Sequence, residues 1–355
     1  QMTTMTAVNA TSEKERLAAL VRFGEFFAGT LFSAYGSVFA PEKYFNPDAG
    51  PRKKRPLRVG APEIHDFTTR DGVQLRLTRY RGGDKGPIVL VPGFAMQASS
   101  FAPPTIDTNL VEFLVERGYD VWLFDYRASI ALPTANTSFD IDQVVTEDWP
   151  EAIAEVRRVT GAPTVQALGH CVGSLSALMT VLAGTEGIGA LVCSQFTVHP
   201  VTSRLNRTKN ALHIVDAMHA LHVRAMRPDA RPTWQNKAMD AALAVVPFPR
   251  GERCGSPTCR WLNSIFGLTH HHAQLNDATH ESFAEAFGWS NIVGLRHLSL
   301  ISRKQQAVDA TGRDVYLPHV DRVTMPVLFV QGSRNHIFRP AGTQRTVEWL
   351  RAHHD

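Results

Sequence analysis

Residues 164–174 read TVQALGHCVGS, and the rest of the chain is expected to fold around this stretch. Its first half is a short apolar run typical of a buried strand, and the residues that follow it favour a helix. At the turn between them, Cys171 stands after Gly169 and His170 and two residues before Gly173. The glycines remove side chains that would collide with the neighbouring strand or helix. The pattern predicts a nucleophilic cysteine at the start of a helix, where N–H groups and the helix dipole favour the thiolate. The alternative is a small cysteine packed like an alanine.

Length and composition point to one large α/β domain with an insertion. The chain has 355 residues, of which 44% are hydrophobic, enough to bury a sizeable core. The formal net charge of +4 is mild, so nucleic-acid binding is not expected, and the basic run at residues 52–55 is interpreted as a solvated linker. Four cysteines do not suggest a disulfide framework, and a nucleophilic thiol favours a reducing compartment, so a cytoplasmic location is expected. No apolar run reaches the roughly 18 residues that a membrane span needs.

The first segment, residues 1–62, is expected to hold a helix and a linker. Residues 12–39 have an amphipathic pattern that begins with a capping box formed by Ser12 and Glu15. Such a helix either docks onto a partner domain or a membrane surface, or packs on its own domain. The proline-rich residues 41–62 indicate a linker. The chain starts at Gln1 without a signal pattern, and its natural start is expected to lie further upstream.

Residues 63–196 alternate between strand and helix patterns. A hairpin is predicted over residues 65–80, with its turn at Asp71-Gly72. Apolar strands are then expected at 87–91, 120–125 and 188–196, with helices at 109–117 and 148–160. Nearly all-apolar strands separated by helices predict a mostly parallel, doubly wound sheet with its site beyond the carboxyl ends of the strands.

Together with the turn at Cys171, this order of elements resembles the α/β-hydrolase fold. The loop after the strand at 87–91 would then supply the first N–H of an oxyanion hole, from Phe94 or alternatively from Ala95. The second donor would be the N–H of Val172. Asp125 and Arg127 follow the next strand and are interpreted as a structural pair.

Residues 197–302 interrupt the alternation and are predicted to form a helical cap over the site. Its apolar side chains would give either a pocket for a bulky lipid-like acyl or sterol group or ordinary cap packing. They are Leu212, Ile214, Val215, Met218, Leu221, Val223 and Met226. Cys254 and Cys259, with histidines at 270–272, do not have a common zinc-ligand spacing, so no metal and no cofactor is expected. His280 is interpreted as structural, and Cys193 as a core residue.

Residues 303–355 resume the sheet pattern with a strand at 326–331 and a helix at 342–354. Asn335 stands where this fold often carries its catalytic acid, and its side-chain oxygen would orient an imidazole without a charge. His336, His353 and His354 are not expected to be the general base. Because the histidine comes last in the fold, the sequence is expected to stop before its final strand and its catalytic histidine.

Several longer stretches carry a more specific resemblance. They are residues 22–36, 79–93, 105–133, 167–174, 252–259, 275–281 and 314–319. These resemble the α/β-hydrolase domain fused to cholesterol-oxidase-like flavin oxidoreductases of the glucose–methanol–choline family. The resemblance implies a fused flavin oxidoreductase, a sterol-like or other hydrophobic ester or thioester as substrate, and Cys171 as the elbow cysteine. Pro92 departs from the histidine that many hydrolases have there.

The resulting hypothesis is a hydrolase that acts through an acyl-cysteine intermediate. One alternative is an acyltransferase resembling polyhydroxyalkanoate synthases, which also use a G-x-C-x-G turn but normally carry a glycine where Ser174 stands. The other is a non-catalytic module that binds hydrophobic substrate for the oxidoreductase.

Overall fold

The computed structural model describes residues 54–226, 240–241, 243–244 and 248–353. The predicted helix at 12–39 and most of the linker lie outside these residues. Seven strands form the main sheet in the order β1-β2-β4-β3-β5-β6-β9. They are β1 (Glu63–Thr68), β2 (Gln74–Tyr80), β4 (Asp120–Asp125), β3 (Pro87–Val91), β5 (Val165–His170), β6 (Ile188–Ser194) and β9 (Val327–Val330). The strands β4, β3, β5, β6 and β9 are parallel to one another, as predicted. β2 runs antiparallel to both of its neighbours, β1 and β4.

The hairpin of β1 and β2 turns at Asp71-Gly72, as the sequence predicts. Gly72 has a φ of 83°, which an L side chain rarely adopts. Next to it, the Thr69 N–H donates to the Val73 carbonyl over 2.9 Å and closes the turn. Val73 lies in the turn rather than in the strand, which begins at Gln74.

Both faces of the sheet are covered by helices. Successive side chains of a strand point to opposite faces, so an apolar strand contributes to the core on each side. In β3, Val89 and Val91 pack with the helices α4 (Trp149–Thr160) and α5 (Val172–Leu182). Ile88 and Leu90 belong to a second core cluster, with α2 (Leu110–Glu116). α13 (Pro340–Arg351) follows β9. The predicted α/β-hydrolase fold is confirmed.

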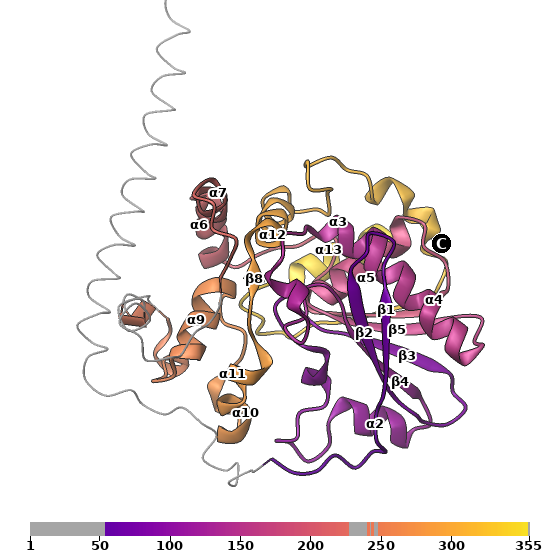
Figure 1. The fold of residues 1–355 in the computed structure, drawn as a ribbon. Coiled ribbons are helices and arrows are strands. Elements are labelled where there is room, and N and C mark those ends of the chain that lie inside the picture. Colours follow the sequence, from indigo (N-terminus) through magenta and orange to yellow (C-terminus); the bar gives the residue numbers. More distant parts are fainter. Residues whose placement is uncertain (1–53, 227–239, 242, 245–247, 354–355) are drawn as a thin grey trace, which may run out of the picture.

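Most of the described elements between β6 and β9 are helices. They are α6 (Arg204–Ala211), α7 (Ile214–Ala220), α9 (Pro257–Phe266), α10 (Asp277–Glu281), α11 (Phe283–Ala286) and α12 (Ile292–Lys304), with a small β7–β8 ladder (Ala225–Met226, Ser290–Asn291). Figure 1 shows α9, α10 and α11 together on one side of the main sheet. None of the described helices is long and apolar enough to cross a membrane.

The seven apolar side chains predicted to roof the site are exposed or half-buried. No residue of α7 is buried, and Leu221 just beyond it is 77% exposed. Leu212 is half exposed as well. α6 and α7 pack against α12, while the apolar side chains of Leu212, Ile214 and Leu221 stay exposed to solvent.

The end of the basic run is not a solvated linker. Arg55 forms two hydrogen bonds of 2.7 Å with the buried carboxylate of Glu112 and a third with the Ile106 carbonyl. This bidentate contact holds the pKa of Glu112 well below its ordinary value. Lys54 pairs with Glu285 on α11. Both contacts fix the start of the described chain onto the domain.

Candidate active site

The turn at Cys171 joins the carboxyl end of β5 to the start of α5. Cys171 has φ 53° and ψ −119°, a strained conformation for a residue with a side chain. Its N–H donates to the Ser194 carbonyl of β6 over 2.9 Å, and its own carbonyl accepts from Ser174 and Leu175. The strained backbone is therefore held by the neighbouring strand on one side and by the first turn of α5 on the other.

The two glycines of the turn are required by contacts with backbone atoms. A Cβ atom on Gly169 would lie 2.4 Å from the carbonyl of Gly173. A Cβ atom on Gly173 would lie 2.4 Å from the carbonyl oxygen of Val91, at the end of β3. Real Cβ atoms do not approach backbone so closely, so neither position accepts another residue without a shift of β3 or α5.

The Cys171 thiol is neutral at pH 7, contrary to the expectation of a thiolate. Burial raises its pKa to about 11, although N–H groups of Val172 and Phe94 interact with the sulfur and lower it. The desolvation cost of a charged sulfur therefore exceeds what the helix start and these two donors supply.

The loop after β3 brings Phe94 to the thiol. Of the two donors considered from the sequence, the structure places the Phe94 N–H against the sulfur. The Phe94 ring is buried, and it lies 6.2 Å from the ring of Phe139 between centroids. Ala95 adopts a φ of 59°, and its carbonyl accepts from Gly288 over 3.1 Å. The loop is thus anchored by packing as well as by backbone hydrogen bonds.

Histidines are not paired with this thiol in the part of the chain that the structure describes. His170, the immediate neighbour of Cys171, places Nδ1 3.2 Å from the Ser194 hydroxyl. Burial lowers the pKa of His170 to about 4, so its ring is neutral at pH 7 and gives no positive charge to a thiolate.

Asn335 lies in the loop after β9, on the carboxyl-end side of the sheet. Its Oδ1 accepts from the N–H groups of Ile337 at 2.8 Å and Phe338 at 2.9 Å. Its Nδ2 donates to Gln195 Oε1 over 2.7 Å, in the loop that follows β6. The amide thus ties two loops together, and both lone pairs of its oxygen are in use.

Asp125 and Arg127 are structural, but they do not pair with each other. Asp125 Oδ1 accepts from the Ala98 N–H over 2.7 Å. Arg127 instead lies 2.6 Å from the buried carboxylate of Asp148 and 2.9 Å from Asp71. Cys193 is buried in β6 as predicted, and burial raises its pKa to about 12.

The cysteines and histidines between residues 252 and 281 come together, against the expectation from their spacing. Donor atoms of Cys254, Cys259, His272 and His280 all lie within 4.8 Å of one another. His280, interpreted as structural, is thus part of a cluster. The sequence shows all four residues within 27 positions, but only the fold of the loops shows that they converge.

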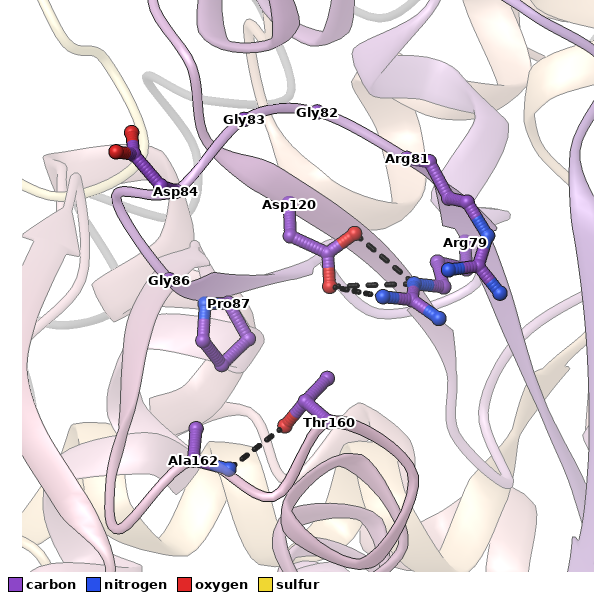
Figure 2. Close-up of a pocket in the computed structure, with 10 residues that line it drawn as sticks. All are labelled: Arg79, Arg81, Gly82, Gly83, Asp84, Gly86, Pro87, Asp120, Thr160 and Ala162. Atoms are coloured by element: carbon purple, nitrogen blue, oxygen red, sulfur yellow. Dashed lines mark hydrogen bonds and ion pairs between the residues drawn. The ribbon is translucent and has the colours of Figure 1, made fainter.

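An open pocket lies at the opposite edge of the sheet, where β3 and β4 begin. Figure 2 shows Arg79 and Asp120 pointing toward each other across it, with a 2.9 Å contact between Arg79 Nη2 and Asp120 Oδ2. Pro87 and the end of α4 at Thr160 also line it. Cys171 follows the carboxyl end of β5, so this pocket is not the space in front of the thiol.

Residues 86–354 match the alpha/beta hydrolase fold family. The chain belongs to this family. It is 29% identical over 192 residues to Lipase lipl-1 from Caenorhabditis elegans, which is 47% of each chain. It is also 29% identical over 124 residues to Lipase 1 from Drosophila melanogaster, covering 32% of this chain and 28% of that protein. The chain thus spans about half, or less, of the lipases that it resembles.

Solved structures agree with the family at the level of the fold. One titled "Lipase (Open form)" superposes with a TM-score of 0.50 at 14% sequence identity, over 83% of this chain and 87% of that one. Sequence identity this low supports the shared fold alone.

Proposed function

We propose that this α/β hydrolase cleaves a hydrophobic carboxylic ester or thioester through an acyl intermediate on Cys171. The observation that carries the proposal is the position of the thiol at the strained turn, facing the N–H groups of Phe94 and Val172. The lipases among its relatives favour a lipid-type ester. A sterol-like substrate and a fused flavin oxidoreductase follow from the family resemblance of the sequence and belong to the same proposal.

The reaction begins when a general base removes the thiol proton. The sulfur attacks the carbonyl carbon, and the two N–H groups stabilise the negative oxygen of the tetrahedral intermediate. Its collapse breaks the bond to the alcohol or thiol, which leaves with a proton from the base. Water, deprotonated by the same base, then attacks the acyl-cysteine and releases the acid and the free thiol.

A base is indispensable here, because the pKa of Cys171 near 11 leaves only about one thiolate in ten thousand at pH 7. We assign this role to a histidine whose imidazole Asn335 would orient. To accept from the imidazole, Asn335 Oδ1 has to release one of its hydrogen bonds with Ile337 or Phe338.

The proposal is tested by trapping the intermediate. The chain is mixed with p-nitrophenyl esters of increasing length and with acyl-CoA and hydroxyacyl-CoA thioesters, and the intact mass is recorded at short times. An acyl adduct that maps to Cys171 and is absent in Cys171→Ala is expected. Cys193→Ala, which removes a buried core cysteine, should still acylate. Unchanged turnover in Cys171→Ala contradicts the proposal, and chain growth from hydroxyacyl-CoA points to a polyester synthase instead.

A second candidate is a non-catalytic module that binds hydrophobic substrate for an oxidoreductase. The neutral thiol and the exposed apolar surface of α7 favour it. This module would bind long-chain esters saturably without forming any adduct on Cys171, an outcome that the same mass measurement separates from catalysis.

A further inference from the structure

Cys254, Cys259, His272 and His280 form a compact cluster in the segment between β6 and β9. Cys254 lies in a loop, Cys259 is in α9, His272 begins the 3₁₀ turn η5 (His272–Gln274), and His280 is in α10. Four separate short elements thus each contribute one sulfur or nitrogen atom. These elements adjoin one another on the side of the sheet where Figure 1 shows α9 and α10.

The spacing of the donor atoms fits a tetrahedral ion. Zinc bonds of about 2.3 Å to sulfur and 2.0–2.1 Å to nitrogen place neighbouring sulfur and nitrogen ligands about 3.6 Å apart on a tetrahedron. Cys254 Sγ lies 3.6 Å from His280 Nε2, and Cys259 Sγ lies 3.4 Å from His272 Nε2. No ligand pair of the cluster exceeds 4.8 Å.

Glu252 orients His272 so that Nε2 of its ring faces the sulfur of Cys259. Glu252 Oε2 lies 2.9 Å from His272 Nδ1 and also accepts the His272 backbone N–H. An imidazole that donates from Nδ1 to a carboxylate keeps a lone pair on Nε2, the nitrogen that faces Cys259. Zinc-ligating histidines are usually supported in this way, by a carboxylate that accepts from the ring nitrogen that does not bind the metal.

Three of the four residues of the cluster are buried, and Cys254 is half-buried. Cys259 is 1% exposed, His272 is fully buried and His280 is 7% exposed. As thiolates and neutral imidazoles, the four side chains would bring lone pairs within 4.8 Å of one another, and a cation between them would stabilise this arrangement whereas apolar packing would not.

We propose that these four residues bind one Zn²⁺ ion, with Cys254 and Cys259 as thiolates, His272 and His280 through Nε2, and Glu252 supporting His272. Each thiol gives its proton to solvent when the ion binds. Two cysteines and two histidines select zinc among abundant divalent cations, and four protein ligands leave no open position, so the ion has a structural role. His270, whose Nε2 lies 3.4 Å from that of His272, stays a neighbour outside the ligand set.

The ion would connect the helices of this segment to the loop that carries Asn335. The second oxygen of Glu252 lies 2.8 Å from His271 Nδ1, and the ring of His271 contacts His336 with centroids 5.4 Å apart. Zinc binding therefore fixes not only α9 and α10 but also, through Glu252 and His271, the position of this loop.

The first test is elemental analysis of the purified chain by mass spectrometry. We expect one zinc per chain, lost in Cys254→Ser/Cys259→Ser and kept in Cys193→Ser, a buried cysteine outside the cluster. Cys171→Ala should also keep its zinc, so that failure of the catalytic proposal and failure of this one are distinguishable. Zinc that stays stoichiometric in the double variant overturns the proposal, as does purified wild-type chain that takes up no zinc when it is added.

Two further measurements do not depend on how well the double variant folds. Cobalt(II) in the wild-type chain should give the intense visible bands of a tetrahedral site and a thiolate charge-transfer band, and their absence contradicts the ligand set. Glu252→Gln should weaken zinc binding about 10- to 100-fold in competition with a chromogenic chelator. Glu285→Gln, at an exposed ion pair with Lys54, is the matched control and should leave zinc affinity unchanged.

Discussion

Gly173, two residues after Cys171, lies so close to the end of β3 that a Cβ atom on it would meet the Val91 carbonyl oxygen at 2.4 Å. Close packing of α5 onto β3 thus sets the position of the Cys171 turn. We expect Gly173→Ala to lower the free energy of unfolding by about 1–3 kcal/mol or more, because the backbone has to move. Urea unfolding followed by circular dichroism measures the loss. Gly60→Ala, where a Cβ meets nothing within 4 Å, serves as the control, and equal midpoints for both variants would contradict the packing argument.

The reactivity of Cys171 should report its raised pKa. Because the thiol is neutral below its pKa of about 11, alkylation by iodoacetamide should be slow at pH 7 and rise about tenfold with each pH unit toward pH 11. Peptide mapping separates Cys171 from the other cysteines. A rate that already levels off near pH 8 would show that the thiolate is better stabilised than burial allows.

Removing Arg127 should leave a buried charge without its partner. Arg127→Met is expected to cost about 3–5 kcal/mol at pH 8, since Asp148 is fully buried and pairs with Arg127 at 2.6 Å. Burial already raises the pKa of Asp148 to about 6 with its partner present, and loss of Arg127 raises it further. In the folded variant, Asp148 favours the protonated form. The difference in unfolding free energy between variant and wild type should therefore shrink as the pH falls from 8 to 5.

Arg158→Met tests whether any arginine would have this effect. Arg158 pairs with Glu155 on the exposed face of α4, and its loss should leave the urea midpoint unchanged. A deficit in Arg127→Met that does not depend on pH would mean that Asp148 is not the group responsible.

Asn335 offers a test that separates loop stability from catalysis. Asn335→Ala removes the acceptor of the Ile337 and Phe338 N–H groups and should destabilise the chain by about 1 kcal/mol. Asn335→Asp keeps this acceptor but loses the donor to Gln195. If the residue also orients a histidine, ester turnover should fall at least tenfold in the alanine variant and recover in the aspartate variant. Turnover that follows stability alone in both variants would limit Asn335 to the loop.

The sequence by itself determined the sheet and the strained turn at Cys171. Short apolar runs such as 87–91 and 120–125 are typical of strands in a sheet that is covered on both faces. Their bounds match β3 and β4. Gly169 and Gly173 mark the turn because no other residue fits between strand and helix there. These features depend on neighbours along the chain and on local backbone geometry, which a sequence displays directly.

The tertiary structure decided which side chains pair with one another and whether the Cys171 thiol is charged. The helix start at Cys171 favours a thiolate, but only the packing around the sulfur shows that desolvation prevails. Arg127 is found with Asp148, 21 positions away, rather than with Asp125. The spacing of Cys254 and Cys259 indicates no metal, yet α9, η5 and α10 bring both to two histidines. Desolvation and ligand geometry depend on distances between segments, and these distances are set by the packed chain, not by sequence separation.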